Sequence, residues 1–391
     1  MDFIELFIHA TRHLPSCERY RRWTAIGLIG ASLERRCWTN FVAGALYPNM
    51  YILLVGGPAS GKTIPIAKAH DLLAGLDLRM APDSATKASF LDCLESALVV
   101  RESAGETLEY SAVSVINDEF GNFIKEYDHV FLNVLNRIYD GRSSHEDTVR
   151  HGGFSVSIQR PLVTMLAGTQ PDYLGLIMPD SAWNTGFMTR TVMVYSGDCI
   201  TKNDLWASAP EESADWQRLQ GHLRELTKWA GQFRWAPDAR AAVLSWRSAD
   251  CPPAPEHPRL RYYNSRRPFF AIKMAMCRAA GQGRLDVTLE DWSQARDWLC
   301  EAEQCITGVF DVMTVAGSDK GVIDDLVMQV RKAYAGHPLS EGALAKMIVG
   351  RVPVERIERI IKAACSMGYL KCLDTFTKTY APSEPAEPAP R

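Results

Sequence analysis

Residues 56–63 read Gly56, Gly57, Pro58, Ala59, Ser60, Gly61, Lys62 and Thr63. This stretch matches the pattern G-x-x-x-x-G-K-[ST] at every defined position, and it joins an apolar run at 50–55 to a helical pattern at 64–73. Glycines let the backbone curl so that several N–H groups point at one centre and bind phosphate oxygens. We therefore expect Lys62 to reach the β- and γ-phosphates of a nucleotide and Thr63 to bind Mg²⁺. The alternative is an ordinary glycine-rich turn between a strand and a helix.

A phosphate-binding loop of this kind needs a carboxylate at the end of a neighbouring strand. The apolar residues 112–116 are followed by Asn117 and then by two acids, Asp118 and Glu119. Asp118 is expected to hold the Mg²⁺ shell, and Glu119 to orient and deprotonate the attacking water. The second acid favours hydrolysis over phosphoryl transfer to a small molecule, which disfavours a nucleotide kinase. A strand end that carries two solvated acids is the alternative.

The regions around the loop predict an α/β fold. Apolar runs of strand length at 50–55, 112–116, 162–167 and 191–195 alternate with helical patterns at 64–73, 86–100 and 131–139. This alternation predicts a mostly parallel sheet with helices on both faces. Residues 149–159 alternate around His151-Gly152-Gly153, which indicates a hairpin.

The rest of the chain is predicted to be mainly helical. We expect an N-terminal helical segment at 1–45, the nucleotide-binding core at 46–200, a helical lid at 201–318, a winged-helix domain at 319–380 and a disordered tail at 381–391. The winged helix is predicted from three helical patterns followed by a short hairpin at 369–372 and 375–380.

Composition excludes several classes of protein. The 391 residues are 47% hydrophobic and carry a net charge of −3, so the chain is no general coat for nucleic acid, and any DNA contact must come from a local patch. No apolar run approaches the ~20 residues of a membrane helix, and residues 1–8 lack the pattern of a signal peptide. The ten cysteines form no Cys-x-x-Cys pair, which disfavours a zinc ribbon or a disulfide scaffold. We expect a cytoplasmic protein without a membrane partner.

Four short motifs follow one another after residue 117: Asp118-Glu119-Phe120-Gly121; Leu135 with Tyr139-Asp140-Gly141; Pro161 with Leu166 and Gly168-Thr169-Gln170-Pro171; and Gly186-Phe187-Met188-Thr189-Arg190. With the loop before them, their order and spacing resemble phage and prophage P-loop ATPases of the DUF3987 type. These are relatives of primase-associated helicases within the wider AAA+ group, and the resemblance covers about residues 1–310. It implies an AAA+ (ASCE) core that uses ATP and Mg²⁺. Because residues 1–391 contain no counterpart of the primase region of many relatives, it implies helicase or loader-like remodelling rather than priming.

The resemblance also implies roles for single residues. Thr169 lies where such ATPases place a polar sensor of the γ-phosphate, and Gln170 is an equally placed rival. Arg190 lies where they send an arginine into the neighbouring subunit's site, which implies a homo-oligomeric ring, with a hexamer favoured; the alternative is a surface ion pair. Arg266 or Arg267 is a candidate second sensor that contacts nucleotide from the lid, and a solvated or ion-paired face is the alternative.

Two regions are candidates for contact with single-stranded DNA in a central pore. The hairpin precedes the sensor strand, where ring helicases of the viral superfamily 3 and MCM type carry a DNA-engaging hairpin, and Arg150 and His151 would occupy its tip. Packing on its own subunit or at a subunit interface is the alternative. The second region is the predicted recognition helix at 354–367. Arg351 just before it, and Arg356, Arg359 and Lys362 within it, give the charge layout that a reader of the major groove or the DNA backbone needs. A winged helix also serves as a protein-docking unit.

The sequence therefore predicts an ATP-hydrolysing AAA+ motor of mobile-element DNA replication, either a ring helicase or a helicase loader with replication partner proteins. A regulatory switch, in which ATP binding controls partner docking through the winged helix, is a second hypothesis. An ATPase of phage defence or transposition is a third.

Overall fold

The computed structural model describes the chain except for residues 42–43, 104–105, 125–127, 142–143, 149–154, 179–182, 184–185, 199, 201–209, 318, 335, 350–351, 353, 375 and 384–391. The chain divides into two compact units, Met1–Phe310 and Asp311–Arg391. The predicted N-terminal helical segment, the core and almost all of the predicted lid belong to the first unit. None of the helices that the structure describes is both long and apolar enough to cross a membrane.

A five-stranded sheet forms the centre of the first unit, in the order β4-β5-β8-β3-β9. The strands are β3 (Tyr51–Val55), β4 (Leu98–Ser103), β5 (Glu106–Asn117), β8 (Leu162–Thr169) and β9 (Thr191–Tyr195). β5, β8, β3 and β9 run parallel, whereas β4 pairs antiparallel with the first half of β5. The predicted α/β fold with a mostly parallel sheet is thus confirmed, and each of the four parallel strands coincides with a predicted apolar run over most of that run's length.

Helices pack on both faces of this sheet. Successive side chains of a strand point to opposite faces, and Tyr51 and Ile52 show which helices lie there. The Tyr51 hydroxyl donates to the Leu135 carbonyl of α6 (His129–Tyr139), whereas the Ile52 side chain lies beside Gly27 of α2 (Glu18–Leu33). α3 (Thr63–Ala74) packs against α2, so α2 and α3 cover one face and α6 the other.

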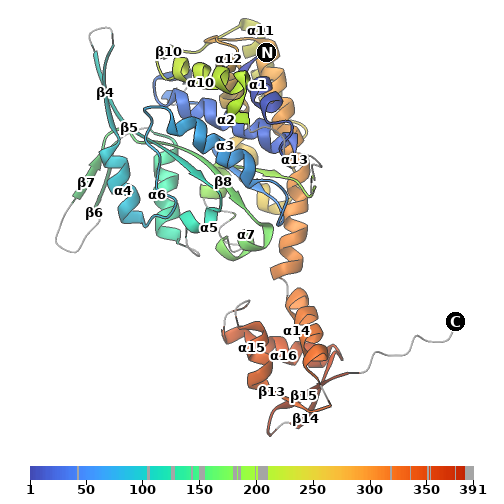
Figure 1. Ribbon diagram of the computed structural model, residues 1–391. Helices are drawn as coiled ribbons and strands as arrows, with labels where there is room; N and C mark the ends of the chain where they lie inside the picture. The colour runs from blue at the N-terminus through green and yellow to red at the C-terminus, as the bar shows by residue number, and fades with distance from the viewer. Residues whose placement is uncertain are drawn as a thin grey trace, which may run out of the picture. The chain divides into compact units, whose positions relative to one another are not determined.

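Two segments differ from the prediction. Residues 37–41 and 44–46 are not helical: β1 (Cys37–Phe41) and β2 (Gly44–Leu46) form an antiparallel pair. The helix predicted at 86–100 is shorter in the structure. α4 (Lys87–Ser96) begins after the Thr86 capping box and ends at Ser96, and β4 follows it. The β-branched residues Val99 and Val100 pair with β5 instead, and Figure 1 shows this antiparallel arm projecting from the sheet.

The remaining elements of the first unit are mostly helical; the last of them, α13 (Leu289–Gly317), ends beyond the unit's last residue Phe310. They are α1 (Phe3–Ala10), α5 (Phe120–Phe123), β6 (His145–Thr148), β7 (Ser155–Ile158), α7 (Pro171–Ile177), α9 (Gly186–Thr189), α10 (Ala214–Leu226), β10 (Gly231–Gln232), β11 (Arg234–Trp235), α11 (Pro237–Ser248), α12 (Arg267–Gly281), β12 (Asp286–Val287) and α13 (Leu289–Gly317), with 3-10 turns at Pro210–Glu212, Pro258–Leu260 and Asn264–Arg266. β6 and β7 form the predicted hairpin. α1, α10 and α12 all contact α2, so the predicted N-terminal segment and lid share one helical layer.

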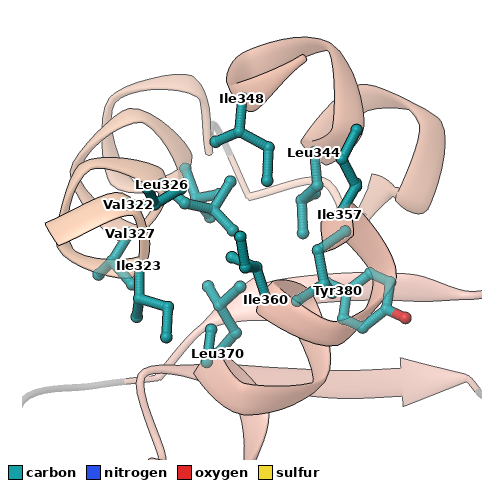
Figure 2. Close-up of a cluster of buried hydrophobic side chains, with 13 residues drawn as sticks. Val322, Ile323, Leu326, Val327, Leu344, Ile348, Ile357, Ile360, Leu370 and Tyr380 are labelled. Carbon is teal, nitrogen blue, oxygen red and sulfur yellow. The ribbon is translucent and has the colours of Figure 1, made fainter. Parts of the chain in front are cut away.

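The second unit has its own hydrophobic core. Its elements are α14 (Asp319–Ala333), β13 (Leu339–Ser340), α15 (Glu341–Ile348), α16 (Val354–Ser366), β14 (Leu370–Asp374) and β15 (Thr379–Pro382), with the sheet order β13-β15-β14. α16 is amphipathic, and its residues Ile357, Ile360, Ile361 and Ala364 pack into a cluster with α14 and α15 (Figure 2). This cluster holds the three helices and the small sheet together.

Candidate nucleotide-binding site

The loop at 56–63 lies at the carboxyl edge of the parallel sheet. Its first residue is tied to the neighbouring strand, because the Gly56 N–H donates to the Thr169 carbonyl at 3.2 Å. Ala59 and Gly61 have φ angles of +59° and +74°. Such left-handed residues alternating with ordinary ones turn successive N–H groups into a common concavity, which suits an anion. A Cβ on Gly57 would meet nothing within 4 Å, so this side of the loop is open.

Lys62 and Glu119 carry opposite charges that act on one another at this loop. The Lys62 ammonium donates to the Gly57 carbonyl at 3.3 Å, and one carboxylate oxygen of Glu119, Oε1, is buried without a hydrogen-bond partner. Burial lowers the pKa of Lys62, which the Glu119 charge opposes. Burial likewise raises the pKa of Glu119; Lys62 opposes this shift and Asp118 adds to it. A half-buried carboxylate whose Oε1 has no partner, within the influence of the loop lysine's charge, is a group that can accept a proton.

Asp118 has different surroundings from Glu119. Asp118 is more exposed than Glu119. Partial loss of solvent around its carboxyl and the charge of Asp83 still raise its pKa, while His70 opposes the shift. Asp83 is a neighbour that the sequence analysis did not identify; its carbonyl accepts a hydrogen bond from the Asn117 amide at 2.6 Å. Thr63, the other predicted metal ligand, is also exposed as the first residue of α3. Two exposed oxygen ligands suit Mg²⁺, which keeps several waters and takes its remaining ligands from phosphates.

The two rival sensor residues differ in exposure. β8 lies between β3 and β5, so its carboxyl end stands between the loop and the two acids. Thr169, the last residue of β8, has 0% of its surface exposed, and its hydroxyl lies 3.5 Å from the Gln170 carbonyl. Gln170 is half-buried and precedes α7. Without rearrangement, therefore, Gln170 can touch a bound ligand and Thr169 cannot.

The N-terminal helices contribute contacts that the sequence analysis missed. The Tyr20 hydroxyl donates to the Val55 carbonyl at 2.6 Å and accepts from the Ser196 N–H at 3.1 Å, so α2 joins the ends of β3 and β9. The connection between α1 and α2 lies against the loop, because a Cβ on Gly61 would stand 2.0 Å from the Pro15 carbonyl oxygen. The helical lead-in is thus part of the site's framework.

Arg190 lies at the amino end of the parallel strands, whereas the loop lies at their carboxyl end. It precedes Thr191, which pairs with Tyr51 at the start of β3, whereas the loop follows Val55 at the other end. At a rise of about 3.3 Å per residue these ends are roughly 13 Å apart. The Arg190 guanidinium binds Asp140 at 3.1 Å and donates to the Gly186 carbonyl at 3.2 Å. The arginine therefore does not reach its own loop.

The structure also separates the two candidate second sensors. Arg266 does not lie at the loop: its guanidinium is 3.3 Å from Asp140, beside Arg190. Arg267 is completely buried, in an ion pair of 2.6 Å with Glu303, and it donates to the Pro253 carbonyl, so it anchors the proline-rich loop. Both arginines are thus held by acids away from the loop at 56–63.

The predicted DNA-contacting residues are only partly described. Arg150, His151 and Arg351 lie outside the described residues, and the base of the hairpin packs against α4 through β7. Arg356 and Arg359 are exposed on the side of α16 away from the core. The charges around them are mixed, because Lys362 pairs with Glu358 at 2.9 Å. The predicted cations of this helix therefore lie beside at least one acid.

Comparisons with known proteins add no assignment: no protein-family model matches the chain, and no curated protein matches it either. Among the described residues, no group of three or more histidines, cysteines or acids is placed to hold a metal ion by itself.

Proposed function

We propose that this chain is an ATP-hydrolysing P-loop ATPase of the AAA+ type whose active site is completed by a second copy. The observation that carries the proposal is that Lys62, on a loop with left-handed residues at Ala59 and Gly61, lies close enough to Glu119 for their charges to act on one another, while Glu119 Oε1 is buried without a hydrogen-bond partner. Met80 also pairs parallel with Ser114 of β5, past the part of β5 that pairs with β4. This bridge extends the parallel part of the sheet.

The chain's own residues suit each step of hydrolysis. The loop N–H groups and Lys62 bind the β- and γ-phosphates, and Gln170 contacts the γ-phosphate or the attacking water. Glu119 accepts a proton from that water while the water oxygen bonds to the γ-phosphorus and the bond between the γ-phosphorus and the β-phosphate oxygen breaks. The raised pKa of Glu119 makes this carboxylate a stronger base than an ordinary glutamate. Mg²⁺ held by Thr63 and Asp118 would neutralise charge on the β- and γ-oxygens.

The place of Arg190 supports an oligomer. Its guanidinium lies at the sheet edge opposite the loop, so it serves a nucleotide only if another copy brings its loop to that edge. Closed rings repeat one such head-to-tail contact. We therefore propose a homo-oligomeric ring in which Arg190 stabilises charge on the neighbour's transferred phosphate.

The motif order that resembles phage-type ATPases supports a motor of DNA replication, a ring helicase or a loader. The second unit supports a contact with DNA, because its helices and strands follow the winged-helix order and Arg356 and Arg359 are exposed on α16. A second candidate is a switch that docks partner proteins. The exposed Met367, Leu373 and Phe376 of that unit favour this candidate, with Phe376 98% exposed.

Two substitutions test the ATPase proposal. Lys62→Ala should abolish turnover, because the β/γ-phosphate charge loses its partner. Glu119→Gln keeps the shape and removes the base, so it should bind ATP with nearly wild-type affinity and hydrolyse it at least about 100-fold more slowly. The measurements are phosphate release and binding of a fluorescent ATP analogue. Near wild-type turnover in Lys62→Ala would overturn the assignment, and weak binding in Glu119→Gln would give Glu119 a structural role.

A further inference from the structure

We infer that Arg266 acts together with Arg190 on the nucleotide of a neighbouring copy, and that Asp140 is the residue that positions both arginines. The inference rests on the proposed ATPase function. It assigns Arg266 to the neighbour's site and gives Asp140 a role that its motif alone does not indicate.

The three side chains form one cluster. Arg190 binds Asp140 Oδ2 at 3.1 Å and Arg266 binds Asp140 Oδ1 at 3.3 Å, so each arginine occupies one oxygen of the same carboxylate. Arg190 and Arg266 come from segments that precede β9 and α12, and Asp140 follows α6. Their side chains are 15%, 28% and 26% exposed, respectively, so the cluster reaches the surface of the unit.

Neighbouring contacts hold this cluster at the edge where the parallel strands begin. The Asn49 side-chain amide, just before β3, donates to the Tyr139 carbonyl at 3.0 Å. The Lys273 ammonium in turn donates to the Asn49 carbonyl at 2.6 Å. Tyr139 packs edge-on against Tyr51, the first residue of β3. Asp140 and Arg266 are therefore fixed at the same edge as Arg190, away from the loop of their own chain.

The charges of the cluster do not balance. Both guanidinium groups are permanently charged, and among the described residues Asp140 is the one carboxylate within ion-pair distance of them. Burial tends to raise the pKa of Asp140, but Arg190, Arg266 and Lys273 outweigh it and hold that pKa below its ordinary value. The cluster thus keeps a net positive charge at a partly exposed edge, where an anion from outside the chain would neutralise it. A triphosphate on a neighbouring copy is such an anion.

The backbone makes room for this arrangement. A Cβ on Gly186 would stand 2.8 Å from the Arg190 guanidinium, so glycine at this position lets the arginine fold back onto Asp140. A cavity of about 100 Å³, lined by Asp140, Arg266 and Lys273 among others, lies beside the cluster. Arg267, the next residue along the chain, is fully buried on Glu303. Of these two adjacent arginines, the structure therefore leaves only Arg266 at the edge.

Mixing inactive variants tests whether Arg266 acts within its own chain or on a neighbour. Arg266→Ala should lower the ATPase rate at least tenfold while the nucleotide affinity of its own loop is kept. The end of the sheet that carries Arg190, Arg266 and Asp140 is called the arginine edge. Mixed in equal amounts with Lys62→Ala, Arg266→Ala should regain activity, because about a quarter of the interfaces then join an intact loop to an intact arginine edge. Arg234→Ala, which removes an exposed arginine paired with Asp286, is the matched control and should stay active.

A second mixture makes the test decisive. Arg190→Ala mixed with Arg266→Ala should stay inactive, because every edge then lacks one of its two arginines. An Arg266 that served its own loop would give the reverse pattern: rescue in this mixture and none with Lys62→Ala. That pattern would overturn the inference. Failure of Arg190→Ala to be rescued by Lys62→Ala, with subunit exchange shown by fluorescent labels, would instead count against the proposed ATPase assembly itself.

Asp140→Asn tests the positioning role. The amide keeps the shape but holds two guanidinium groups weakly, so the rate at saturating ATP should fall about tenfold while nucleotide binding and thermal stability remain close to wild type. Mixing with Lys62→Ala should rescue it, as for the arginine variants. A residue with a merely structural role would lower stability and would not be rescued by an intact edge from another subunit. Loss of folding without rescue would therefore overturn the role of Asp140.

Discussion

Lys273 is a buried lysine beside the cluster of Arg190, Arg266 and Asp140. Only 2% of this residue is exposed, and its ammonium donates to the Asn49 carbonyl and side-chain oxygens and lies 4.2 Å from the centre of the Tyr139 ring. Burial lowers the pKa of Lys273 to about 7, although Asp140 opposes the shift. The lysine therefore holds its proton less firmly than an ordinary lysine, and the two arginines supply the permanent charge of the cluster.

The pH dependence of stability should reveal this shift. Between pH 7 and the ordinary lysine range the unfolded chain binds a proton that the folded chain does not, so the contribution of Lys273 to stability rises with pH. The unfolding free energy of the wild type, relative to Lys273→Met, should increase by up to about 1.4 kcal/mol per pH unit from pH 7 to 9. Denaturant unfolding at several pH values measures it. A difference that does not change over this range would show that Lys273 keeps an ordinary pKa.

The loop and the connection between α1 and α2 form one structural element of the site. Gly61 has a positive φ, and the Pro15 carbonyl occupies the space where its side chain would be. Glycine is therefore required at this position by the backbone conformation and by a segment more than forty residues earlier in the chain.

Two glycine substitutions in the same loop separate these requirements. Gly61→Ala should destabilise the protein by at least about 2 kcal/mol, because it adds backbone strain to a clash with the Pro15 carbonyl. Gly57→Ala is the matched control, since its Cβ would enter open space, and it should melt within a few degrees of wild type. Thermal unfolding of both variants measures the difference. Equal melting temperatures would show that Pro15 does not lie against the loop.

The sequence predicts those helices and strands whose pattern of residues lies within one short stretch of the chain. The strand, loop and helix over 50–74 agree with prediction because apolar pattern, glycines and helix start all fall in one stretch. The sequence pattern does not predict β4, although the β-branched residues Val99 and Val100 favour a strand over the end of a helix. The contact of Arg266 with Asp140 joins residues 126 positions apart and depends on how α12 packs, so no local pattern reveals it. Local sequence likewise does not reveal that Tyr20 bonds to β3 and β9, or that Thr169 is buried while Gln170 is partly exposed.

At the scale of the whole molecule, the two units carry different parts of the proposed function. The first unit contains the loop and the arginine edge at opposite ends of one sheet, which is the arrangement that a head-to-tail assembly requires. The second unit has its own core and presents both cations and apolar side chains. Its surface therefore suits two kinds of partner.

Salt dependence separates DNA from protein as the partner of the second unit. If α16 contacts phosphates, Arg356→Ala with Arg359→Ala should weaken binding of a single-stranded oligonucleotide at least fivefold and flatten its salt dependence, with basal ATPase unchanged. Fluorescence anisotropy at several salt concentrations measures this, and Phe376→Ala serves as the matched surface variant. Unchanged DNA binding in the double variant, at every salt concentration, would favour the protein-docking switch.

The most direct test of the central claim is the ATPase rate per subunit, measured over a wide range of protein concentration. Because the loop and Arg190 of one chain lie at opposite sheet edges, a lone subunit has an incomplete site. The rate per subunit should therefore rise steeply with concentration and level off where light scattering shows the oligomer, and Lys62→Ala should stay inactive throughout. A rate per subunit that is the same for the monomer and the oligomer would contradict the account.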